Sequence, residues 1–177
     1  MNFSVEIVTQ GVDYTRFRRA YNSEQFNREV AEAANLKERT LIEHVKEPDG
    51  KERKRIRIVP NVSLPGAVQK LFPNGQFSYD EVTVLDVQAR TATYAIETPI
   101  GDKIQVTGHA KYIEEGGGVR LVFEGEAKVK IFGVGSLVER YLVGEVTTRY
   151  ALVQRLLQAF IDQGRDVSLT PSIPVPR

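Results

Sequence analysis

The sequence contains no cysteine, and its only histidines are His44 and His109. Without thiols the chain forms neither disulfides nor thiolate-bound metal sites. The two histidines fall on different predicted strands, and neither has a carboxylate at the spacing that a metal site requires. We therefore expect no metal ion and no cofactor.

Signatures of common catalytic sites are also missing. Ser136 follows the glycines of FGVGS, but it has no nucleophile-elbow context and no histidine near it in the sequence. The same glycines do not form a dinucleotide fingerprint, because Val138 stands where the third glycine would be. We assign no catalytic residue, and a non-enzymatic role is favoured.

Long apolar runs and a strong net charge are absent as well. No apolar run approaches the roughly 20 residues that span a bilayer. The first ten residues alternate in polarity instead of following a basic segment with an apolar one, which indicates a strand and not a signal peptide. The formal net charge of +1 argues against nucleic-acid binding. These patterns predict a cytoplasmic protein.

The apolar spacing predicts three helices besides the first strand. Residues 14–33 follow a helical period that is interrupted before Ser23, a suitable N-cap, so we predict two short helices. A long amphipathic helix is predicted over residues 135–162, and prolines follow it. We expect one domain of residues 1–164 and a mobile proline-rich tail of residues 165–177.

Between these helices the apolar period changes to two, which is typical of strands. Turn residues such as Asp49-Gly50 link the strands as antiparallel hairpins. One short helix, capped by Ser63, interrupts them. The predicted strands cover residues 36–45, 51–59, 76–87, 89–99, 103–113 and 118–131.

This order of elements resembles that of the START-like (SRPBCC, helix-grip) superfamily. The segment GEAKVKIFGVGSLVERYL is similar to the join of last strand and long helix in an uncharacterised bacterial branch, and LPGAVQKLFP has some PRELI-like character. The resemblance implies an α+β helix-grip fold. A curved antiparallel sheet of about six to seven strands would wrap around the long C-terminal helix, with two short helices after the first strand and a cavity inside.

The long helix carries a charge on its apolar face. Arg149 lies among the predicted inward residues, and Glu145 lies one turn before it, where the two can pair. The guanidinium either reaches solvent at an open end of the sheet or binds the polar end of a ligand, and Glu81 is a candidate partner from the sheet. The predicted inward stripe is Val138, Leu142, Val153, Leu156 and Phe160, and the predicted solvent side is Arg140, Thr147, Gln154 and Gln158.

Small residues lie midway along the last two predicted strands, where larger apolar residues give way to Gly108 and Ala110 on one strand and to Gly125 and Ala127 on the other. Either the helix backbone approaches closely there, or the small side chains leave a pocket. The resemblance implies the pocket, and we predict that a hydrophobic small molecule or lipid binds in it. The candidate ligand-binding residues are Glu81, Tyr94, Leu121, Phe123, Tyr141, Leu142, Glu145 and Arg149. The alternatives are a polyketide cyclase/aromatase-like enzyme and a protein-interaction domain without a ligand.

A row of cations is the sharpest charge feature. Lys51, Arg53, Arg55 and Arg57 share one face of a predicted strand. The row is either a solvated sheet face or a contact for an anionic membrane surface.

Overall fold

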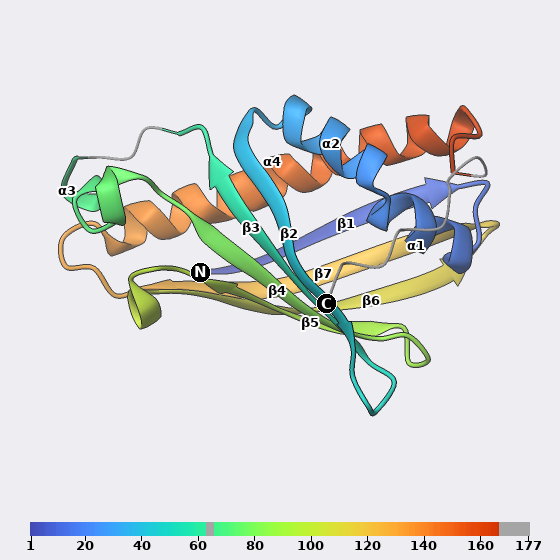
Figure 1. Cartoon of the computed structure of the whole chain (residues 1–177), viewed down its shortest axis with the longest axis horizontal. Helices are drawn as coiled ribbons and strands as arrows, with labels where there is room; N and C mark the ends of the chain where they lie inside the picture. Colours follow the sequence, from blue (N-terminus) through green and yellow to red (C-terminus); the bar gives the residue numbers. More distant parts are fainter. Residues whose placement is uncertain (63–65, 167–177) are drawn as a thin grey trace.

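The computed structural model describes residues 1–62 and 66–166, and it confirms an α+β helix-grip fold (Figure 1). Seven antiparallel strands form one sheet in the order β1-β7-β6-β5-β4-β3-β2. The strands are β1 (Asn2–Gln10), β2 (Leu36–Lys46), β3 (Glu52–Pro60), β4 (Tyr79–Asp86), β5 (Thr91–Glu97), β6 (Ile104–Glu115) and β7 (Gly118–Val129). The helices are α1 (Tyr14–Asn22), α2 (Glu24–Ala33), α3 (Gly66–Gln69) and α4 (Gly135–Asp162).

The long helix α4 lies along the sheet, and α1 and α2 cover one end of the molecule (Figure 1). Two short 3-10 turns, Pro73–Gly75 and Gly101–Lys103, complete the regular structure. The break between α1 and α2 is at Ser23, whose Oγ accepts a hydrogen bond from the Phe26 backbone N–H at 3.2 Å. The predicted Ser63 cap and residues 167–177 of the predicted tail lie outside the described residues.

The inward face of α4 shares four residues with the predicted stripe and differs from it near the C-terminal end. Leu157 is fully buried, whereas Leu156 is only partly buried. Because α1 and α2 cover the C-terminal half of α4 from the side, the buried face turns there toward Leu157 and Ile161. The other four residues of the stripe are buried as predicted.

Two glutamines of α4 bind the edge of the sheet. The backbone N–H groups of Val8 and Gln10, at the free edge of β1, donate to the side-chain oxygens of Gln154 and Gln158 at 3.0 and 2.9 Å. These glutamines lie on the exposed side of α4, as predicted, but they are partly buried because they bind β1. An edge strand presents N–H groups that need acceptors, and α4 supplies them.

The small residues of β6 and β7 make room for aromatic rings. Gly108 and Gly125 are register partners. A Cβ on Gly125 would lie 2.5 Å from the Phe3 ring, and one on Gly108 would lie 3.1 Å from the Phe123 ring. The helix backbone is not among the nearest atoms at either glycine. The small residues two positions further along these strands, Ala110 and Ala127, each line a cavity between the sheet and α4.

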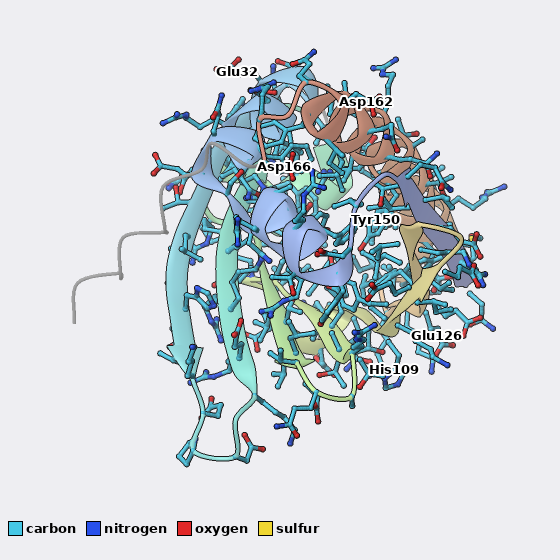
Figure 2. The ribbon with its side chains drawn as sticks, turned by 90° about the vertical axis from the view of Figure 1, so that its right-hand side faces the viewer. Glu32, His109, Glu126, Tyr150, Asp162 and Asp166 are labelled. Atoms are coloured by element: carbon cyan, nitrogen blue, oxygen red, sulfur yellow. The ribbon has the colours of Figure 1, made fainter. Side chains whose placement is uncertain are left out.

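The two residues after Gly164 pack against the domain. Asp166, labelled in Figure 2, is buried and accepts a hydrogen bond from Arg16 Nε at 2.7 Å. Arg165 forms an ion pair with Glu29. These contacts attach the chain beyond α4 to α1 and α2.

Candidate functional site

Arg149 extends from α4 into the interior and contacts β4. Its guanidinium donates a hydrogen bond to the Tyr79 hydroxyl, and Nη1 lies 3.7 Å from Glu81 Oε1. The side chains of Arg149 and Glu81 are 17% and 20% exposed. Among the described residues no ion pair joins Arg149 to Glu145. The guanidinium is therefore held inside by a partner from the sheet, as a buried charge requires.

Tyrosine hydroxyls surround this ion pair. Tyr94 donates a hydrogen bond to Glu81 Oε1 at 3.4 Å. Burial raises the pKa of Tyr79 to about 12, although Arg149 lowers it. Burial likewise raises the pKa of Tyr141 to about 12, and its hydroxyl has no hydrogen-bond partner among the described residues. These hydroxyls therefore stay protonated at neutral pH and can donate to a polar group in the interior.

A first cavity of about 30 Å³ lies between this cluster and α4. Six of the eight predicted ligand-binding residues line it, namely Glu81, Tyr94, Tyr141, Leu142, Glu145 and Arg149. A cavity of this volume has room for one or two water molecules.

The other two predicted residues, Leu121 and Phe123, line a second cavity of about 90 Å³. Glu81, Tyr94 and Tyr150 line both cavities. The Phe123 ring stacks on Tyr150 at 5.4 Å between centroids and meets Tyr94 edge-on at 4.9 Å. Figure 2 shows Tyr150 in the interior between α4 and the sheet. We call Tyr94, Phe123 and Tyr150 the aromatic partition, since Tyr94 and Tyr150 line both cavities and the Phe123 ring packs against both of them.

Sequence reasoning missed several residues that line the second cavity. Tyr150 follows Arg149 directly, and its helical position was a usable signal. Arg39, His44 and Lys54 also line this cavity. Arg39 and His44 would lie on opposite faces of a regular strand, but a register shift between Leu41 and Glu43 turns His44 to the same side.

The outer basic row is paired with carboxylates throughout. Lys51 contacts Asp49 at 2.5 Å, and Arg53 contacts Glu43 and Glu47 at 3.1 and 2.9 Å. Arg55 and Arg57 both contact Asp80 of β4. The Arg57 hydrogen bond lowers the pKa of Asp80 against the opposing effect of burial, and Arg55 adds to it. Arg53, Arg55 and Arg57 thus form ion pairs on the outer face of the sheet, whereas Lys51 precedes β3 and pairs within the hairpin turn.

The described parts of the chain contain neither a metal-binding cluster nor a membrane-spanning helix. No group of three His, Asp or Glu side chains within residues 1–62 and 66–166 could hold a metal ion. None of the helices in these residues is long and apolar enough to cross a bilayer.

Comparison with known proteins gives a family and a fold. Residues 7–161 match the family described as "Protein of unknown function (DUF2505)". A search of curated protein sequences gives no match.

Several solved structures share the fold. TTHA0849 from Thermus thermophilus has 14% identity and a TM-score of 0.63, over 93% of this chain and 99% of that chain. The Zhui aromatase/cyclase from Streptomyces sp. R1128 has 9% identity and a TM-score of 0.53, over 92% and 93%. A START superfamily protein from Mycobacterium smegmatis has 17% identity and a TM-score of 0.50, over 92% and 97%. At these identities the similarity establishes a START-like fold.

Proposed function

The chain belongs to the DUF2505 family, and we propose that this member binds a hydrophobic small molecule or lipid between the sheet and α4. The observation that carries the proposal is the pair of cavities between the sheet and α4, which share Glu81, Tyr94 and Tyr150 as lining residues. Ligand sites of this kind are mostly apolar and contain a few polar groups that fix orientation. Arg149, Glu81 and the tyrosine hydroxyls are those polar groups here.

Binding requires the aromatic partition to move. The cavities measure about 30 and 90 Å³, whereas sites for drug-sized ligands measure roughly 300–1,000 Å³. Rotation of Tyr94 and Tyr150 would join the two cavities into one space that runs along α4. The ligand would then replace the ring contacts that Phe123 makes with these tyrosines.

The experiment is native mass spectrometry of freshly purified protein, in the wild type and in Ala110→Phe. Ala110 lines the second cavity, and a phenyl ring there would fill it. Ala95→Phe is the matched control, because Ala95 lies one residue from Tyr94 on the outer face of β5. We expect a retained ligand in the wild type and in Ala95→Phe, and none in Ala110→Phe. A wild-type protein with no retained ligand, and no uptake of decanol when this is added, would favour the protein-interaction alternative.

Aromatase/cyclase-like catalysis is the second candidate, because the tyrosine hydroxyls beside the Arg149–Glu81 pair can donate hydrogen bonds that orient a reactive chain. A tyrosine whose pKa is raised to about 12 is a weak general acid, so these hydroxyls would position the chain and not protonate it. The mass of the recovered ligand distinguishes the two functions. A carrier releases the molecule that it took up, and an enzyme releases a molecule of changed mass or absorbance.

Contact between the outer basic row and an anionic membrane stays a prediction. Reversal of two charges, Lys51→Glu with Arg53→Glu, should weaken co-sedimentation with vesicles that contain phosphatidylserine, and added salt should do the same. Because carboxylates already pair with the row, we expect this binding to be weak. Binding that does not depend on salt would contradict an electrostatic contact.

A further inference from the structure

Two cations at the second cavity have no carboxylate partner among the described residues. Lys54 of β3 donates one hydrogen bond, to Asn22 Oδ1 at 2.7 Å, and Arg39 of β2 forms neither a hydrogen bond nor an ion pair within this part of the chain. Both side chains are half-buried. An ammonium has three donors and a guanidinium has five, so most of their donors have no protein acceptor among the described residues.

The register of the strands places these cations on the inner face of the sheet. Lys54 pairs with His44, and Arg39 pairs with Ile58, which is buried in the core. Lys54 lies two residues before Ile56 and points to the same side. The arginines of β3 therefore lie on the outer face of the sheet, whereas Lys54 lies on the inner face.

The carboxylates that line the same cavity already have other partners. Glu52 accepts a hydrogen bond from Arg18 at 2.8 Å, and Glu81 is paired with Arg149. Neither Arg18 nor Arg149 lines the second cavity. The charges of Arg39 and Lys54 thus remain as an excess of two positive charges where the half-exposed Arg39 and His44 meet solvent.

We propose that Arg39 and Lys54 bind the anionic head group, a carboxylate or phosphate, of an amphiphile whose apolar part lies against the aromatic partition. This inference rests on the proposed function and names the class of its ligand. The cations lie in the same cavity as Leu121, Phe123 and Tyr94, so one molecule can contact both groups. Charge-assisted hydrogen bonds from a guanidinium and an ammonium are the strongest that such a head group can accept.

The first experiment compares decanoate, decyl phosphate, decanol and decyltrimethylammonium by calorimetric titration of the full chain. We expect the two anions to bind more tightly than decanol, and the cation to bind most weakly. In Arg39→Gln/Lys54→Gln the affinity for decanoate should fall by about ten- to a hundredfold, with the affinity for decanol unchanged. The matched control, Arg19→Gln/Lys37→Gln, removes two charges at exposed positions and should leave both affinities unchanged.

Failure of the inference and failure of the proposed function give different results. If decanol and decanoate bind equally and the double variant affects neither, the head-group site is wrong and the apolar site stands. If none of the four compounds binds, the proposed function is wrong and the inference falls with it. If acetate or inorganic phosphate binds as tightly as its decyl counterpart, the site takes a free anion and the amphiphile is excluded.

The second experiment tests Lys54 by pH. Burial, followed by the nearby Arg39, lowers the pKa of Lys54 to about 8, so its ammonium loses its charge between pH 7 and 9. A fatty-acid carboxylate remains ionised over this range. The affinity for decanoate should therefore fall as the pH rises from 7 to 9, and Lys54→Arg, which stays charged, should abolish most of this fall. An equal fall in Lys54→Arg would contradict the role of Lys54.

Other ionisable groups face Lys54. They are the same in the wild type and in Lys54→Arg, so a difference in pH dependence between the two proteins comes from Lys54. These groups are Arg18 and Tyr21 of α1, Arg39 and His44 of β2, Glu52 of β3, Glu81 of β4, Tyr94 of β5, Tyr112 of β6 and Tyr150 of α4.

Discussion

At the scale of single residues, the contact with Glu81 stabilises the positive charge of Arg149 in the interior of the fold. Breaking a buried ion pair leaves one charge uncompensated, whereas removing both charges is far less costly. Arg149→Met should therefore lower the free energy of unfolding by about 3–5 kcal/mol. Arg149→Met/Glu81→Gln should recover a large part of this loss. Urea denaturation of the single and double variants measures both values.

Arg140→Met on the exposed side of α4 is the control, and it should change the free energy of unfolding by less than about 0.5 kcal/mol. A cost of Arg149→Met no larger than that of the control would show that the guanidinium is not held in the interior.

The sequence allowed most of this cluster to be anticipated, because a charged residue on an apolar stripe needs a partner. Glu81 was a candidate since it lies on a predicted strand among apolar residues. Tyr79 could not be chosen in the same way, because its hydroxyl becomes a partner only through the register of β4 under α4. Helical spacing favoured Glu145, yet Arg149 reaches across to the sheet instead.

At the scale of elements, the inward face of α4 is set by what covers it. Leu157 is fully buried in the cluster formed with α1 and α2, and Leu156 packs only at its border. Leu157→Ala should therefore cost about 2–5 kcal/mol of unfolding free energy, and Leu156→Ala clearly less. Thermal and urea denaturation of this adjacent pair measure the difference. Equal costs would contradict the orientation of the helix.

Periodicity predicted the type and order of the elements, because alternation and helical spacing follow directly from burial on one face. It failed where a strand is irregular or an edge needs acceptors. The register shift after Leu41 moves His44 to the inner face, and Gln154 and Gln158 accept hydrogen bonds from the N–H groups of β1. These features depend on neighbours far apart in the sequence.

At the scale of the whole molecule, the sheet and α4 enclose an interior that is almost filled by its own aromatic rings. Arg149 and Tyr79 line the first cavity, the cations Arg39 and Lys54 line the second, and Glu81 lines both. A ligand that displaces the partition would contact both ends. We propose that residues 1–164 form the binding domain. Arg165 and Asp166, which follow it, form ion pairs with α2 and α1.

The most direct test of ligand binding inside the fold is an isotope-filtered NOE experiment with decanoate and labelled protein. The account predicts NOEs from the alkyl chain to the rings of Tyr94, Phe123 and Tyr150, together with chemical-shift changes of these rings. NOEs confined to residues on the outer face of the sheet, or decanoate binding that leaves the three rings unchanged, would contradict it.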